Sequence, residues 1–190
     1  VTGDEKWVVY VNHSHKRQWV DADEQPEPDT KPDLHPKQVM LSEWWDVQGI
    51  IHFELLPDNT SITAAYYCNQ LERLSQKISL LRPQHGKVFF LHDNARPHVA
   101  KTTRLKLLQL GWEIMPYPPY SPNLAPSDFH LFRSLQNHLQ GKTFDRREDV
   151  EIFLRQFFES LPASFYRDGI HSLAERWRTV VDNDGEYVID

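Results

Sequence analysis

Residues 88–94 read Val-Phe-Phe-Leu-His-Asp-Asn, and this stretch gives the first clear indication of the fold. Residues 88–91 form a short, unbroken apolar run, which is typical of a central strand buried on both faces of its sheet. Asp93 follows directly where such a strand would end. Because active-site residues gather at the carboxyl ends of strands in α/β sheets, the stretch predicts a buried strand with a polar site at its edge.

Further strands and helices are predicted on both sides of this stretch. Runs of apolar, β-branched and aromatic residues predict strands at residues 7–11, 38–46, 49–56 and 112–115. Apolar residues at helical spacing predict helices at residues 64–81, 97–110, 126–139, 150–161 and 170–181. The first helix has Thr63 as its cap and ends before Pro83. This order predicts an α/β fold in which helices pack on a mixed sheet.

A long polar segment separates the first predicted strand from the next two. Residues 12–37 contain four prolines and a run of acidic residues, and they predict an inserted loop with a possible short strand at residues 18–20. Loops of this length are uncommon inside compact domains and are usually functional or disordered. Both a flexible excursion and a contact role stay open for this loop.

The second strand after the loop is predicted at residues 49–56. We expect Ile51, Phe53 and Leu55 to share one face of this strand.

Composition excludes several classes of protein without naming a partner. The chain has 190 residues and one cysteine, Cys68, so it forms no intramolecular disulfide, which fits a reducing compartment. No apolar run approaches the roughly 20 residues of a membrane span. The net charge of −6, from 27 acidic and 21 basic residues, argues against tight nonspecific binding of nucleic acid. Bound metal ions would nevertheless supply local positive charge.

Three aspartates are the candidate chemical groups. Asp128 shares a helical stripe with apolar residues, where an ionised carboxylate is costly unless something compensates it. Asp4 interrupts an apolar strand pattern, and Asp93 ends the buried strand. Taken singly, each has an ordinary explanation, as a solvent-facing strand residue, a turn residue or a helix cap. Together they would supply oxygen ligands from different elements, the arrangement that a two-metal site needs.

Three motifs around these aspartates resemble the acidic motifs of mariner transposases. They are residues 1–7 (Val-Thr-Gly-Asp-Glu-Lys-Trp), 92–98 (His-Asp-Asn-Ala-Arg-Pro-His) and 120–130 (Tyr-Ser-Pro-Asn-Leu-Ala-Pro-Ser-Asp-Phe-His). Between Asp93 and Asp128 lie 34 residues, the separation that marks this branch of transposases. The resemblance extends over essentially the whole chain. Asn123 is a departure, since the family usually has an acid at that position.

The resemblance implies a ribonuclease-H-like fold, with residues 1–190 forming one catalytic domain and residues 12–37 the insertion that reaches across a transposase dimer. It implies that Asp4, Asp93 and Asp128 bind two Mg²⁺ or Mn²⁺ ions. The enzyme would cut DNA at terminal inverted repeats and join the 3′ ends to a TA target in the nucleus. The abrupt start of the chain indicates a domain cut from a longer protein. The amino-terminal domains that recognise the inverted repeats would be absent.

Other residues in the motifs are candidates for contacts with DNA. Arg96, His98 and His130 are candidates for phosphate contacts, while Tyr120, Ser121 and Pro122 are candidates for contacts with target bases. Helix-start and loop-anchor roles are the alternatives for His98 and Tyr120. Glu5 is a possible stand-in ligand, but neighbouring strand residues point to opposite faces, so Asp4 and Glu5 cannot both face the site.

Two competing interpretations stay open. His92, Asp93, His98 and His130 are a possible zinc set in a hydrolase, because zinc favours imidazole ligands whereas Mg²⁺ favours oxygen. That hypothesis leaves Asp4 and Asp128 without a role. The other alternative is a domesticated, catalytically silent domain that binds DNA or dimerises. If the three aspartates meet in the absence of metal, we expect the pKa of at least one of them to rise.

Overall fold

The computed structural model describes residues 1–13, 36–58 and 60–183. The strands are β1 (Thr2–Val9), β2 (Gln38–Asp46), β3 (Gly49–Leu55), β4 (Phe89–Phe90) and β5 (Glu113–Ile114). The helices are α1 (Ala64–Leu81), α2 (Arg96–Val99), α3 (Lys101–Gln109), α4 (Arg133–Leu139), α5 (Arg147–Ser160) and α6 (Ala163–Asp182). A short 3-10 helix, η1 (Pro122–Leu124), precedes a π-helical segment, η2 (Ser127–Phe132), which continues into α4.

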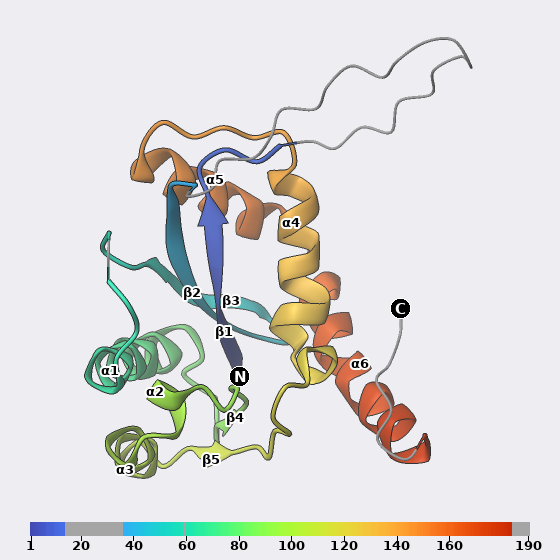
Figure 1. The fold of residues 1–190 in the computed structure, drawn as a ribbon. Coiled ribbons are helices and arrows are strands. Elements are labelled where there is room, and N and C mark those ends of the chain that lie inside the picture. Colours follow the sequence, from blue (N-terminus) through green and yellow to red (C-terminus); the bar gives the residue numbers. More distant parts are fainter. Residues whose placement is uncertain (14–35, 59, 184–190) are drawn as a thin grey trace.

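Strand β1 lies at the centre of the strand arrangement. It pairs antiparallel with β2, which pairs antiparallel with β3. On its other side, the amide of Gly3 donates to the carbonyl of Leu91 (3.2 Å) and the amide of Leu91 to that of Val1 (2.9 Å), while β4 pairs in parallel with β5. The resulting order is β3-β2-β1-β4-β5, with parallel and antiparallel neighbours, so the predicted mixed sheet is confirmed (Figure 1).

Helices cover both faces of the sheet and enclose two apolar cores. One core joins α4, α5 and α6 to β1 and β2, and the other joins α1 and α3 to β2, β3 and β4. Trp44 and Trp45 are neighbours in β2, and each is almost fully buried in a different core. Because successive strand residues point to opposite faces, this pair of tryptophans anchors both helical layers to one strand.

Several sequence-based expectations were wrong in detail. Strand β1 starts at Thr2, five residues before the apolar run at residues 7–11, so Asp4 lies inside the strand, which is one of the two placements that the sequence left open. The single helix expected at residues 97–110 is two helices, because the backbone of Ala100 is extended (φ −59°, ψ 149°). Phe89 in β4 is 50% exposed, so this strand is not buried on both faces. The boundaries predicted for the β2–β3 hairpin and for α1 are confirmed to within a residue.

The expectation that Ile51, Phe53 and Leu55 share a face was also wrong. Ile51 packs in the α1 core, whereas Phe53 and Leu55 pack in the core of α4, α5 and α6. The register of β2 and β3 shifts between Trp44 and Trp45, and such an irregularity changes the face that the following residues present.

Most of the inserted loop predicted at residues 12–37 lies outside the described residues. At its base, the amide of Tyr10 donates to the carbonyl of Lys37 at 2.9 Å, so the two ends of the segment lie side by side. In the described ranges, no helix is both long and apolar enough to cross a membrane.

Candidate active site

The three aspartates lie where β1 runs past the carboxyl end of β4. Thr2 forms a parallel bridge with Leu91, and Asp4 and Asp93 each lie two residues further along their segments. They are therefore level with each other on neighbouring strands. Asp128 occupies the first turn of η2, which contacts β1. The positions expected for the three residues, a central strand, the end of its neighbour and a helix start, are those observed.

The carboxyl groups of Asp4 and Asp128 are electrostatically coupled. Burial raises the pKa of Asp4 well above its usual value, and the charges of Asp128, Glu5 and Asp93 raise it further. Burial also raises the pKa of Asp128, although a hydrogen bond with Asp4 and the charge of Lys6 oppose this rise. A hydrogen bond between two carboxyl groups requires a proton on one of them. The expectation that the pKa of at least one aspartate rises is confirmed, with burial as the largest cause.

Asp93 behaves differently from the other two. Its Oδ1 accepts a hydrogen bond from the amide of Ala95 at 2.9 Å and lies 2.5 Å from Nδ1 of His98. Burial raises the pKa of Asp93, but the hydrogen bonds from His98 and Ala95 outweigh burial and leave the pKa below its usual value. The site therefore holds one ionised carboxylate beside two carboxyl groups that retain protons more readily.

A pocket of about 440 Å³ opens beside Asp93 and Asp128. Its other lining residues are Asn94, Ala95, Arg96, Tyr117, Pro119, Tyr120, Ser121 and Pro122. Four of the six residues predicted to contact DNA are therefore brought together with two of the aspartates. Tyr120 is 90% exposed and has a left-handed backbone (φ 55°), an uncommon conformation for a bulky residue.

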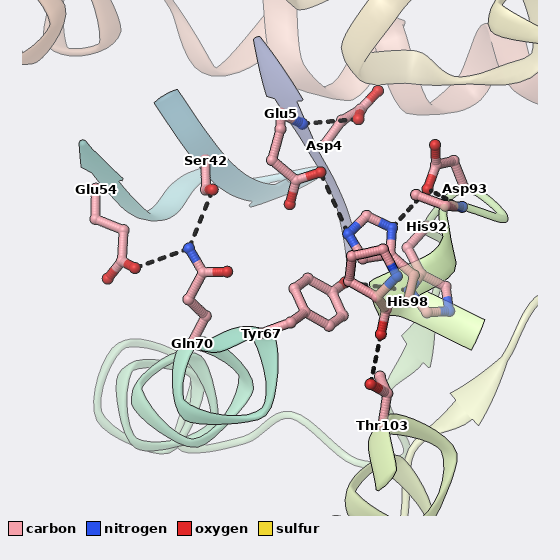
Figure 2. Close-up of polar contacts among 12 residues, drawn as sticks. Asp4, Glu5, Ser42, Glu54, Tyr67, Gln70, His92, Asp93, His98 and Thr103 are labelled. Atoms are coloured by element: carbon pink, nitrogen blue, oxygen red, sulfur yellow. Dashed lines mark hydrogen bonds and ion pairs between the residues drawn. The ribbon is translucent and has the colours of Figure 1, made fainter. Parts of the chain in front are cut away.

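The two predicted histidine contacts are placed elsewhere. His98 is 2% exposed, with Nδ1 at Asp93 and Nε2 3.3 Å from the Glu5 carboxylate (Figure 2). His130 stacks on Trp45, and its Nε2 lies 2.8 Å from the carbonyl of Phe165 in α6. Neither ring faces the pocket. These contacts also separate His130 from the other members of the possible zinc set.

The charge of His98 follows from its two carboxylate partners. Burial lowers the pKa of His98, but Asp93 and Glu5 outweigh burial and raise the pKa to about 10, so both ring nitrogens carry protons. His92 lies beside it, with ring centroids 5.4 Å apart. Burial and the charge of His98 lower the pKa of His92 to about 4, so this ring is neutral at pH 7.

Glu43 was not among the residues selected from the sequence. It lies directly opposite Asp4 in the β1–β2 pairing and is fully buried. Neither carboxyl oxygen has a well-formed hydrogen bond to a described residue, although the Ser127 hydroxyl lies near enough to lower the pKa. Burial outweighs Ser127 and raises the pKa of Glu43 well above its usual value. The sequence did contain a sign of this burial. Glu43 lies two residues from Leu41 and two from Trp45, so the alternation of the strand puts it on the same core-facing side as these apolar residues.

The aspartates do not form a closed set of metal ligands. Within the described ranges, no group of three or more His, Cys, Asp or Glu side chains is arranged to hold a metal ion. The chemistry of the donors still fits a hard divalent cation, because all three offer carboxylate oxygens from different elements. Burial is the largest cause of the raised pKa values of Asp4 and Asp128, and the charge of Asp93 raises both further. A cation would offset this charge repulsion.

Comparisons with known proteins identify the family. Residues 9–88 match a family model described as a transposase, partial DDE domain. The chain is 41% identical to the Mariner Mos1 transposase of Drosophila mauritiana over 192 residues, covering 99% of this chain and 56% of that protein. It is 44% identical to the human histone-lysine N-methyltransferase SETMAR over 191 residues, covering 98% of this chain and 28% of that protein.

A solved structure of the catalytic domain of Mos1 mariner transposase is 38% identical and superposes with a TM-score of 0.83, covering 99% of this chain and 83% of that one. The chain belongs to the mariner transposase family. The sheet order and the helices on both faces are those of the ribonuclease-H-like fold that was predicted, now confirmed for this mariner chain. The chain spans about half the length of Mos1 transposase.

Proposed function

We propose that this chain is the catalytic domain of a DNA transposase in which Asp4, Asp93 and Asp128 bind divalent metal ions, two Mg²⁺ or Mn²⁺ ions in each site. The observation that carries the proposal is that Asp93, just after β4, and Asp128, at the start of η2, line one open pocket, while the charges of both act on Asp4 in β1. Solved structures of Mos1 transposase that contain Mn or Mg support the choice of metal.

When bound, the ions would activate a water or a 3′-hydroxyl and stabilise the leaving oxygen of a phosphodiester. The protein's own residues prepare the site for this chemistry. Oδ1 of Asp93 is held by Ala95 and His98, which leaves Oδ2 to face a ligand. Asp128 lies at the start of a helix, where the helix dipole favours a negative charge.

DNA is the proposed substrate and the pocket is its proposed contact surface. Arg96 supplies a positive charge at the pocket for a phosphate, and the exposed ring of Tyr120 supplies a surface on which a base stacks. Ser121 and Pro122 complete this wall. His98 and His130 have no part in the proposed DNA contact, because packing and carboxylate partners occupy their rings.

The biological reaction proposed is cleavage at the inverted-repeat ends of a transposon and joining of the 3′ ends to a TA target. Mos1 structures that are described as paired-end and strand transfer complexes support this reaction and a dimer of the full-length protein. The nucleus is the proposed location, since chromosomal DNA is the proposed target.

A strand-nicking assay tests the proposal. Supercoiled plasmid incubated with the purified chain and Mn²⁺ should be converted to nicked circles, and EDTA should stop the conversion. An Asp93→Asn variant purified in parallel controls for contaminating nuclease. The competing function is a catalytically silent DNA-binding or dimerisation domain. Equal nicking by both proteins, or none by either, would favour that silent domain.

A further inference from the structure

We propose that His98 and Glu5 are positioning residues that fix the carboxylate of Asp93 in its metal-binding orientation. The inference rests on the proposed function of Asp93 as a metal ligand. His98 bridges the two carboxylates, with Nδ1 2.5 Å from Oδ1 of Asp93 and Nε2 3.3 Å from Oε2 of Glu5 (Figure 2). No DNA contact is needed to explain this buried histidine.

The alternation of strand β1 gives its two adjacent acids separate tasks. Successive strand residues point to opposite faces. Asp4 points towards Asp128 at the start of η2, and Glu5 points towards α2 and His98. Strand β1 therefore presents the carboxylate of Asp4 to the proposed metal site. Through Glu5 and His98, the same strand fixes the carboxylate of Asp93.

The ring of His98 has little freedom to turn. It packs against the ring of Tyr67 from α1, with centroids 4.1 Å apart, and lies beside His92. Its side chain is 2% exposed, whereas that of Asp93 is 39% exposed. The buried imidazole of His98 thus holds the partly exposed carboxylate of Asp93. This is the arrangement expected when a buried residue orients a metal ligand through a hydrogen bond.

The two contacts leave Asp93 with one oxygen for a ligand. Oδ1 accepts from His98 and from the amide of Ala95, so rotation of the carboxylate would break both hydrogen bonds. Partners of this kind typically contribute 10- to 100-fold (order of magnitude) to metal affinity. We therefore expect the affinity for Mn²⁺, and not only the activity, to depend on His98.

Two amide substitutions separate the two contacts of the ring. Asn reaches about as far as Nδ1 of histidine, so His98→Asn keeps a donor towards Asp93 and loses the one towards Glu5. Gln reaches about as far as Nε2, so His98→Gln keeps a donor towards Glu5 and loses the one towards Asp93. The inference predicts that His98→Gln weakens Mn²⁺ binding about 10-fold or more, and that His98→Asn weakens it several-fold less.

The measurement is calorimetric titration of each purified chain with Mn²⁺, together with its thermal unfolding midpoint. Tyr67→Phe is the matched control, because it removes a buried hydrogen bond to His92 at 3.1 Å and keeps the packing on His98. Its Mn²⁺ affinity should stay within about threefold of the wild type. Glu5→Leu, which leaves His98 in place, provides the same test if His98→Gln fails to fold; it should weaken Mn²⁺ binding, and Glu5→Gln should restore most of that loss.

The outcomes distinguish this inference from the proposed function. If the wild type binds Mn²⁺ in a manner that Asp93→Ala abolishes, but His98→Gln and Glu5→Leu bind it equally well, the positioning role is wrong and the metal site stands. The positioning role would also be overturned if His98→Asn and His98→Gln lost the same Mn²⁺ affinity and their unfolding midpoints fell by the same amount. Such a result would mean that both variants act only through stability. If Asp93→Ala leaves Mn²⁺ binding unchanged, the proposed metal site fails, and the positioning role fails with it.

Discussion

At the scale of single residues, the site separates three chemically identical acids by their surroundings. Asp93 has a lowered pKa because His98 and Ala95 donate to it, while burial, and after it the charge of Asp93, raises the pKa values of Asp4 and Asp128. Such separation of pKa values marks functional sites more often than structural ones. The consequence is that protons and metal ions compete for the same oxygens.

We predict that Asp4→Asn, Asp93→Asn and Asp128→Asn each abolish Mn²⁺-dependent nicking while the protein still folds. Asp4→Asn should in addition raise the unfolding midpoint in EDTA, because it removes one of the repelling carboxyl groups. Differential scanning fluorimetry and the plasmid assay measure the two effects. Near wild-type nicking by any one variant would remove that residue from the proposed catalytic set.

The affinity for Mn²⁺ should fall as the pH of the titration is lowered from neutral into the acid range. The pKa values of Asp4 and Asp128 lie above the ordinary 3.8, so these groups take up protons at higher pH than ordinary aspartates. A protonated carboxyl group must release its proton before it ligates a cation, and lower pH therefore opposes binding. Calorimetric titration across this range provides the test, and an affinity independent of pH would contradict the raised values.

Glu43 should make stability depend on pH in the opposite direction from a salt-bridged acid. The pKa of Glu43 in the folded state is raised above the ordinary 4.5. Its contribution to the free energy of unfolding is therefore fully present below about pH 4.5 and is lost as the pH rises through the folded-state pKa. Glu43→Gln removes this dependence. The difference in unfolding free energy between variant and wild type, from urea titrations in EDTA, should therefore grow in favour of Gln as pH rises. A constant difference would mean that Glu43 does not change its protonation.

At the scale of elements, the close pairing of β1 and β2 brings Asp4 into position. A Cβ added to Gly3 would overlap the indole of Trp44 and would lie 2.7 Å from the carbonyl oxygen of Glu43. The tryptophan is buried in the α1 core and cannot move away cheaply. This glycine is therefore required by the approach of two strands, one residue before a proposed metal ligand.

Gly3→Ala should destabilise the fold by about 1–3 kcal/mol, the usual effect of overpacking a core. Gly86→Ala is the matched control, since a Cβ there meets nothing within 4 Å among the described residues. Urea unfolding of both variants measures the difference. If Gly3→Ala unfolded at the same urea concentration as Gly86→Ala, the contact between β1 and Trp44 would be looser than the structure shows.

At the scale of the whole molecule, charge and fold act in opposite directions on DNA binding. The net charge of −6 repels a polyanion, whereas the pocket presents Arg96 beside the acids that a metal would neutralise. We predict that this chain binds DNA weakly and with little preference for sequence. Adding Ca²⁺ as a cation that does not support cleavage should strengthen binding. Mobility shifts showing tight binding in EDTA, with discrimination between inverted-repeat and random DNA, would overturn this prediction.

The sequence alone determined the features that depend on local physics. Thr63 caps α1, its side chain accepting from the amide of Tyr66 at 3.2 Å, and the helix ends before Pro83 as predicted. The positions of Asp4, Asp93 and Asp128 in their motifs were read correctly as strand, strand end and helix start. Capping, helical period and strand alternation act within a few residues, so their signals are present in the chain itself.

Only the tertiary structure decided which polar side chains face the site. His98 and His130 were both expected at DNA, yet one is enclosed between Asp93 and Glu5 and the other packs on Trp45. Glu43 gained its importance from standing opposite Asp4, 39 positions away. Burial and partners of this kind come from segments far apart in the sequence, and no local period records them. The helices and strands therefore followed from short-range patterns, whereas the charge and orientation of each site residue followed from long-range packing.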